Sequence, residues 1–219
     1  TKQHWQHELN DEDLRELETA ATNCLQVSAD LTQIRRSNFV LPTLGLRLRE
    51  IHDALLQGCG FALIRSLPVR QWSRELTAAA FFGLGTHLGH PRPQNSKGHV
   101  LGHVIDMGLE ATDPNVRIYQ THERQTFHTD SSDIVGLVCL QQAKAGGDSA
   151  LVSSNTIYNQ MRASHPELAA LLFDPIATDR RGEVAPGQKP FFEIPVSNIN
   201  LITRTKSYPC TMNSNVNNN

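Results

Sequence analysis

Hydrophobic positions near the N-terminus recur at helical spacing. Apolar side chains at every third or fourth position predict a helix over about 11–25, with Asn10 as its N-terminal cap. A second apolar stripe predicts a helix that begins near Leu44 and ends at Gly58. Both segments have the pattern of helices that bury one face, which predicts a structural role for them rather than a catalytic one.

The pattern then shifts from helices to strands. A short buried strand over 61–64 and a third helix over 73–88 come first. Beyond them, the segments 117–130 and 134–140 are typical of strands, and a turn followed by another strand is predicted within 143–154. The intervening residues are rich in Gly, Pro and His, which favours loops.

Ser164 and Glu167 have the spacing of a capping box and predict one more helix, running to about Phe173. The order along the chain is therefore helices first and strands afterwards. This order predicts an α+β fold, in which a β-sandwich or barrel carries flanking helices.

The C-terminal end differs from the rest of the chain. Seven asparagines occur from Asn198 onward, and the last three residues are all asparagine. Such a polar, low-complexity segment is typical of a disordered or weakly attached tail. The pattern predicts a helical extension over 1–43, a main domain over 44–196 and a tail over 197–219.

Composition limits the classes of partner. The chain has 20 Lys and Arg against 22 Asp and Glu, a formal net charge of -2, which argues against nucleic acid. It has no apolar run of 18 residues, and its polar, acidic start is unlike a secretory signal, so no membrane partner is expected. The four cysteines form no CxxC pair, which favours a reducing, cytoplasmic location with Cys139 buried as a small hydrophobic residue.

The segment with candidate chemistry is Phe127-His128-Thr129-Asp130. On a strand, His128 and Asp130 would project to the same face because side chains alternate. An imidazole and a carboxylate suit ferrous iron in a two-His-one-carboxylate site, which leaves positions open for a bidentate cosubstrate and dioxygen. A lone HxD pair is weak evidence, because it occurs by chance in many proteins.

The surrounding motifs resemble the TauD/TfdA-like group of Fe(II)- and 2-oxoglutarate-dependent dioxygenases. The resemblance covers about 44–195, most of the chain. The matching motifs are HTD at 128–130, GGDS at 146–149, GFALIR at 60–65, LGTHLGHPRPQ at 84–94 and DRRGEV at 179–184. It implies a double-stranded β-helix, the clavaminate synthase-like jelly roll, with Fe(II) as cofactor, 2-oxoglutarate as cosubstrate and a small organic molecule as substrate.

The resemblance also implies roles for individual residues. His128 and Asp130 match the first His and the carboxylate ligand of the iron. Ser149 stands where the family usually has Thr, and its hydroxyl would donate a hydrogen bond to 2-oxoglutarate; alternatively, it is a turn residue. From its position rather than from the resemblance, Arg124 lies four residues before His128 and would share its strand face, where it would meet an anionic substrate group or be solvated. Gln94 would line the substrate entrance or bond its own backbone.

The family pattern also requires a distal His and an Arg that binds 2-oxoglutarate. The only His after Asp130 is His165, at a predicted helix start that faces solvent, so no distal metal His is found. Arg204 lies in the off-pattern tail. The jelly roll is therefore expected to be incomplete at the C-terminus, as a changed reading frame, a retained intron, a wrong gene model or a genuine short isoform would make it.

Two functions stay open from the sequence. One is a TauD/TfdA-type dioxygenase that oxidises an unidentified small organic substrate. The other is a catalytically inactive remnant or binding module without the distal His and the Arg. Little or no turnover is expected from these 219 residues, because a missing ligand weakens a metal site strongly. Neither the substrate nor the oligomeric state can be read from the sequence.

Overall fold

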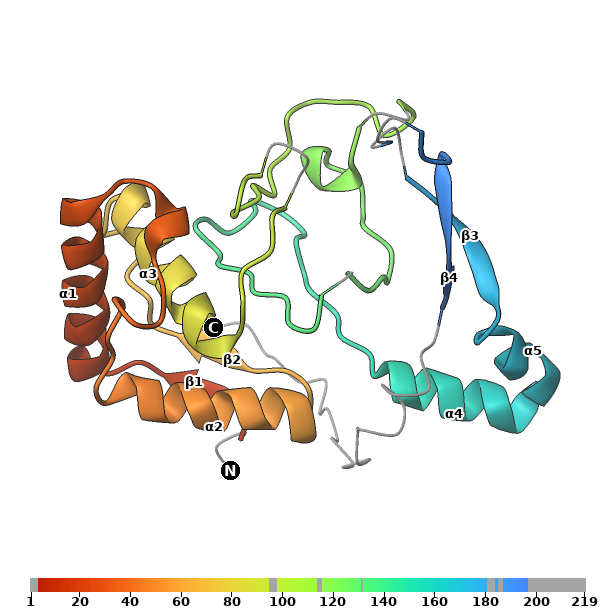
Figure 1. The fold of residues 1–219 in the computed structure, drawn as a ribbon, viewed down its shortest axis with the longest axis horizontal. Coiled ribbons are helices and arrows are strands. Elements are labelled where there is room, and N and C mark those ends of the chain that lie inside the picture. The colour runs from red at the N-terminus through yellow and green to blue at the C-terminus, as the bar shows by residue number, and fades with distance from the viewer. Residues whose placement is uncertain are drawn as a thin grey trace. The chain divides into compact units, whose positions relative to one another are not determined.

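The structure is a computed structural model that describes residues 4–94, 98–113, 116–130, 132–180, 184 and 187–196. The predicted tail over 197–219 lies outside these residues. Contacts divide the chain into two units (Figure 1). Of the described residues, the first unit contains 4–88 and 139–155, and the second contains the remainder.

The first helix, α1 (Asp11–Val27), begins where the sequence predicts. The Asn10 side chain accepts hydrogen bonds from the backbone N–H groups of Glu12 and Asp13, at 2.9 and 3.0 Å. The Asp13 carboxylate in turn accepts one from the Asn10 N–H at 2.9 Å. This capping box satisfies N–H groups that have no partner within the helix.

Two further helices complete the scaffold of the first unit, and their predicted positions are confirmed. Helix α2 (Leu44–Gln57) ends at Gly58, whose N–H donates to the Ala54 carbonyl. Helix α3 (Arg74–Leu88) packs against both α1 and α2 (Figure 1). A short 3₁₀ turn, η1 (Leu31–Gln33), links α1 to the segment that leads into α2.

The core of this unit lies between the three helices. Leu17, Leu44 and Leu48 are fully buried, as is Phe39 from the α1–α2 connection. The ring of Phe39 lies against Gly83 of α3. The backbone carbonyl of Phe39 accepts a hydrogen bond from His87 Nε2 at 2.8 Å. Apolar side chains from all three helices therefore hold this unit together.

A two-stranded parallel sheet accompanies the helices. Strand β1 (Gln6–Glu8) pairs with β2 (Leu63–Arg65), with Gln6 opposite Leu63 and Glu8 opposite Arg65. The strand predicted over 61–64 thus begins two residues later, because the pairing with β1 sets its bounds.

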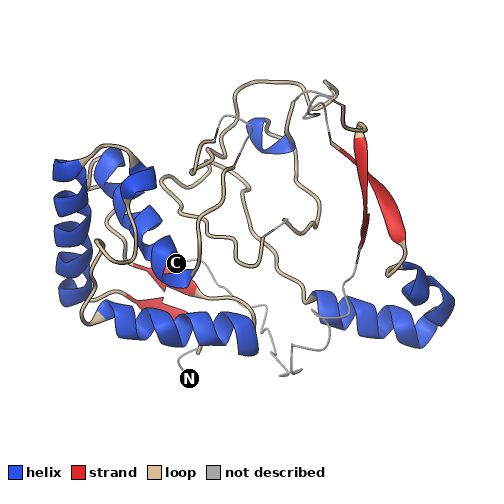
Figure 2. Ribbon diagram, in the orientation of Figure 1, coloured by secondary structure: helices blue, strands red, loops and turns tan. Residues whose placement is uncertain are grey.

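The second unit has a helical pair and a hairpin. Helices α4 (Ser154–Ser164) and α5 (Pro166–Leu171) are followed by the antiparallel strands β3 (Pro175–Asp179) and β4 (Phe191–Pro195), shown in Figure 2. A second 3₁₀ turn, η2 (Ile118–Gln120), lies earlier in the chain. The chain is therefore a mixture of helix and sheet.

The strands predicted over 117–130, over 134–140 and within 143–154 are not present among the described residues. Two backbone hydrogen bonds connect 105–107 to 119–120, from Ile105 N–H to the Tyr119 carbonyl and from Met107 N–H to the Gln120 carbonyl. An alternating pattern makes a strand only where another segment supplies a ladder of such bonds. The described residues therefore show no double-stranded β-helix.

Two smaller predictions are also wrong. Ser164 ends α4 instead of capping the next helix, and its Oγ donates to the Gln160 carbonyl. His165 is the N-cap of α5, where Pro166 takes the first helical position that suits a residue without an N–H. Cys139 is exposed, because its apolar segment joins no sheet that would bury it.

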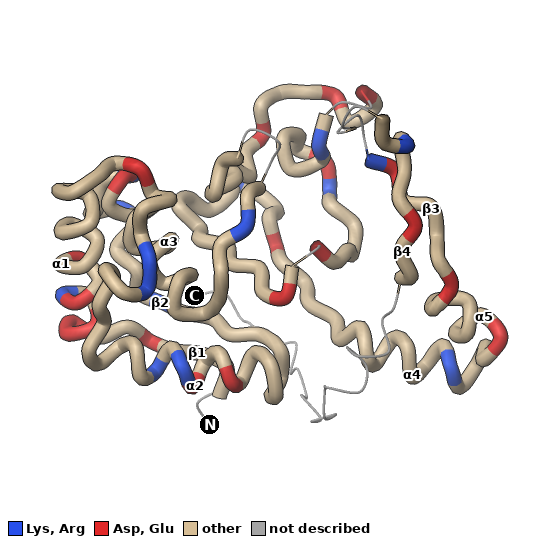
Figure 3. The backbone as a smooth tube through the Cα atoms, viewed as in Figure 1, with Lys and Arg blue, Asp and Glu red and all other residues tan. Residues whose placement is uncertain are grey.

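Positively and negatively charged residues are interspersed along the chain (Figure 3). Within the described residues, no helix has the length and apolar character needed to cross a membrane. The cytoplasmic location and the lack of a nucleic-acid partner stay predictions.

Candidate metal centre

His128 and Asp130 lie side by side although they are not on a strand. Nε2 of His128 is 4.0 Å from Oδ1 of Asp130, and the two side chains are 47% and 54% exposed. The segment around them is irregular. Their proximity therefore comes from the local backbone path and not from the alternation of a strand.

The backbone fixes which nitrogen of His128 carries the proton. Nδ1 lies 2.8 Å from the Thr126 carbonyl oxygen. A carbonyl oxygen can only accept, so Nδ1–H is the donor, and in the neutral ring Nε2 bears the lone pair. Metal-binding histidines usually have this arrangement, with one nitrogen held by a carbonyl and the other free to bind.

The Gln125 side chain contacts the other nitrogen of the His128 ring. Its Nε2 is 3.1 Å from Nε2 of His128. An amide nitrogen can only donate, so it gives a hydrogen bond to the lone pair of His128. The candidate metal-binding nitrogen is thus already hydrogen-bonded in this structure.

The donor atoms fit two positions of an iron site. In an octahedral site with metal–ligand distances of about 2.1 Å, neighbouring donors stand about 3 Å apart. Nε2 of His128 and Oδ1 of Asp130, at 4.0 Å, need a shift of only about 1 Å to reach that spacing. An imidazole nitrogen and a carboxylate oxygen are also the donor types of ferrous sites.

The third donor is not found in the part of the chain that the structure describes. Among those residues, no group of three or more His, Cys, Asp and Glu side chains is placed to hold a metal ion. His165 Nδ1 lies 3.6 Å from Glu167 Oε1, and the His165 side chain is 62% exposed. Arg204 lies outside the described residues.

The other predicted residues meet different outcomes. Ser149 is exposed and follows Gly146 and Gly147, whose φ angles of 68° and 80° are positive, a backbone conformation that favours glycine. Its contact with 2-oxoglutarate stays a prediction. Arg124 is exposed, and without a strand the argument that it shares a face with His128 is lost.

Gln94 bonds its own backbone neighbourhood. Its side-chain Nε2 donates to the Arg92 carbonyl at 2.9 Å, and its backbone N–H donates to the His99 carbonyl at 2.6 Å. Such bonds are typical of a turn residue, which was one of its two predicted roles. Its role at a substrate entrance stays a prediction.

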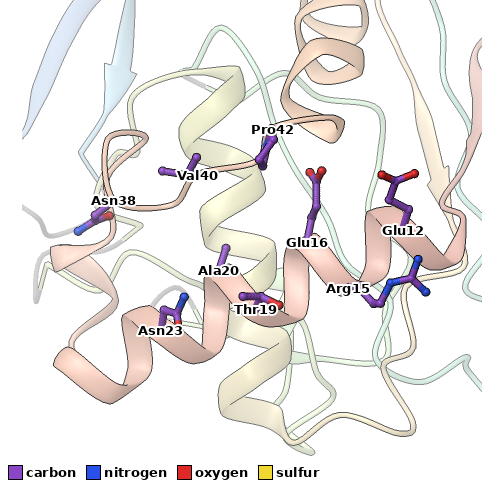
Figure 4. Close-up of a pocket in the computed structure, with 9 residues that line it drawn as sticks. All are labelled: Glu12, Arg15, Glu16, Thr19, Ala20, Asn23, Asn38, Val40 and Pro42. Atoms are coloured by element: carbon purple, nitrogen blue, oxygen red, sulfur yellow. The ribbon is translucent and has the colours of Figure 1, made fainter.

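A separate surface depression lies in the first unit (Figure 4) and contains none of the predicted site residues. One face of α1 forms one wall, and the loop before α2 forms the other. Glu16 in this wall accepts hydrogen bonds from the N–H groups of Thr43 and Leu44, at 2.9 and 3.0 Å. Its carboxylate is therefore committed to capping α2.

Comparison with known families decides the identity of the chain. Residues 27–208 match the family described as "Taurine catabolism dioxygenase TauD, TfdA family". The chain belongs to this family. The matched range contains His128, Asp130 and Ser149, so the TauD/TfdA resemblance carried by the sequence motifs is confirmed.

Two curated proteins resemble the chain. FR-33289 synthase of Streptomyces rubellomurinus is 29% identical over 86% of this chain and 56% of its own length. Taurine hydroxylase-like protein SAT17 of Stachybotrys chartarum is 29% identical over 75% of this chain and 44% of its own length. The chain thus spans about half the length of the curated relatives it matches.

Sequence reasoning did not single out Gln125 or Thr126, which contact the two nitrogens of His128. Their only sequence signal is their position, three and two residues before a candidate ligand. The contacts of these two residues with the His128 ring depend on the side-chain rotamer and the local backbone path, which composition and periodicity do not specify.

Proposed function

We propose that the chain carries part of the catalytic centre of an Fe(II)- and 2-oxoglutarate-dependent dioxygenase that oxidises a small organic substrate. The observation that carries the proposal is the pair formed by His128 Nε2 and Asp130 Oδ1, 4.0 Å apart, in a member of the TauD/TfdA family. The complete enzyme has the jelly-roll fold that the family implies, with this pair on its inner side.

His128 and Asp130 would hold the iron through the imidazole Nε2 and the carboxylate. The Thr126 carbonyl keeps the proton on Nδ1, which would leave the lone pair of Nε2 to bind the metal. By its match to the family motif, Ser149 would donate its hydroxyl hydrogen to a carboxylate of 2-oxoglutarate. When bound, the iron and 2-oxoglutarate supply the activation of dioxygen that these side chains cannot perform.

The second candidate is a binding module without turnover. It is favoured by the lack of a third ligand among the described residues. Two protein ligands leave a metal ion weakly held and poorly oriented. We therefore expect little or no succinate from these 219 residues by themselves.

The test combines metal binding with succinate release. Titration of the purified chain with Co²⁺, a divalent stand-in for Fe²⁺, should show a site whose affinity falls at least tenfold in His128→Ala and Asp130→Ala. His165→Ala is the matched control and should bind as the wild type does. Affinity that is unchanged in His128→Ala would contradict the proposed centre.

The succinate assay separates the two functions. Fe²⁺, 2-oxoglutarate and dioxygen are added to the same variants, and succinate is quantified. Metal binding without succinate favours the binding module. Succinate that is released by the wild type and lost in His128→Ala would establish the chain as a dioxygenase in its own right.

A further inference from the structure

The contact between Gln125 and His128 assigns a role to a residue that the proposed function does not use. We propose that the Gln125 amide occupies the metal-binding nitrogen of His128 in the metal-free chain and leaves it when a divalent cation binds. Gln125 is then a positioning residue that competes with the metal. This inference rests on the proposed metal centre.

The competition follows from the number of lone pairs on the ring. Nδ1 of His128 uses its proton in the 2.8 Å bond to the Thr126 carbonyl, so the neutral ring has one lone pair, on Nε2. The Gln125 amide lies 3.1 Å from that nitrogen and donates to it. A lone pair that accepts a hydrogen bond cannot also bind a metal ion, so the two states exclude each other.

Asp130 favours the exchange. Its Oδ1 lies 4.0 Å from Nε2 of His128, and neither of these two acceptor atoms can donate to the other in the neutral ring. A divalent cation between them attracts both the lone pair and the carboxylate, whereas the amide of Gln125 serves only the ring. A metal ion would therefore interact with both His128 and Asp130, whereas the Gln125 amide interacts with His128 alone.

The expected effect is modest and has a definite sign. The His128 side chain is 47% exposed, so water can donate to Nε2 when the Gln125 amide is removed. Only part of the free energy of the hydrogen bond is then lost. Removal of the amide should tighten Co²⁺ binding by about twofold to fivefold. A residue that merely supported the loop would, on removal, weaken binding instead.

The experiment uses the purified full chain and Co²⁺ as the probe. Gln125→Leu keeps the approximate size of the side chain and removes its donor, and Gln125→Ala is the second variant. Gln160→Leu, which replaces an exposed glutamine on α4, is the matched control. Affinities are measured by titration, and circular dichroism checks that each variant keeps its helices.

Nitrogen NMR of the metal-free chain gives an independent readout. The Nε2 resonance of His128, identified by its loss in His128→Ala, should shift in Gln125→Leu because the amide no longer donates to it. The Nδ1–H tautomer should persist, since the Thr126 carbonyl still holds it. The Gln160→Leu spectrum should match the wild type.

The outcomes separate this inference from the proposed function. Tighter Co²⁺ binding in both Gln125 variants, with the shifted Nε2 resonance, supports the inference. Unchanged or weaker binding in these variants, while His128→Ala still lowers the affinity at least tenfold, overturns the role of Gln125 and leaves the metal centre standing. Unchanged binding in His128→Ala overturns the metal centre itself.

Discussion

Gly83 lies where α3 meets the ring of Phe39. A Cβ atom at this position would stand 2.3 Å from Cε2 and Cζ of that ring, far inside van der Waals contact. Because Phe39 is fully buried, the ring has little room to move away. Gly83→Ala should therefore lower the free energy of unfolding by about 2–3 kcal/mol in urea denaturation.

Gly85 on the same helix is the matched control. It is exposed, and a Cβ there would meet no atom within 4 Å. Alanine is the better helix former, so Gly85→Ala should leave stability unchanged or raise it by up to about 1 kcal/mol. Equal losses in the two variants would contradict the close packing of α3 on Phe39.

His7 on β1 makes stability depend on pH. Burial and the Arg47 guanidinium hold the pKa of His7 below its ordinary value of 6.5, although Glu50 acts in the opposite direction. As pH falls below about 6.5, the unfolded chain takes up a proton before the folded chain does, so the free energy of unfolding falls. His7→Gln should flatten this dependence in urea midpoints measured from pH 7.5 down to about pH 5. An unchanged slope would contradict the prediction.

At the level of single residues, the sequence predicts the His128–Asp130 pair but not its surroundings. Two residues with one between them cannot lie far apart, so the pairing needs little knowledge of the fold. The contacts from Thr126 and Gln125 to the ring depend on the local backbone turn. Periodicity gives no information about a turn of this kind.

Among the elements, α2 has an unusual start. The side chain of its N-cap residue, Thr43, makes no capping hydrogen bond to the helix backbone. Glu16 of α1 instead accepts from the N–H groups of Thr43 and Leu44. Glu16→Ala should therefore lower the free energy of unfolding by about 1 kcal/mol, as measured by urea denaturation. Glu18→Ala, which changes an exposed glutamate on the same helix, should have little effect.

The elements that the sequence predicts best are those that carry their own hydrogen bonds. The bounds of α1, α2 and α3 agree with the predicted ranges to within two residues. Each of these helices forms its bonds within itself and has an apolar stripe facing the core. The strands predicted over 117–130 and 134–140 need partners from elsewhere in the chain, and the pattern of one segment cannot show whether those partners are present.

At the scale of the whole molecule, stability should be distributed unevenly. Residues 132–153 contain no helix or strand, and Val135, Leu137 and Leu151 are 53%, 79% and 58% exposed. The helices of the first unit have buried apolar faces and internal hydrogen bonds. Amide hydrogen exchange should therefore be slow in α1–α3 and fast in 132–153. Equal protection in both regions would contradict this division.

The cap that Glu16 provides has a practical consequence for expressing this protein. The TauD/TfdA match begins at residue 27, where α1 ends, so a shortened gene drawn to the family boundary would omit this helix. Two N–H groups of α2 would then lose their acceptor, and the side of α3 that α1 covers would face water. Recombinant chains that start upstream of Asn10 should stay in solution, whereas those that start at 27 should collect in inclusion bodies.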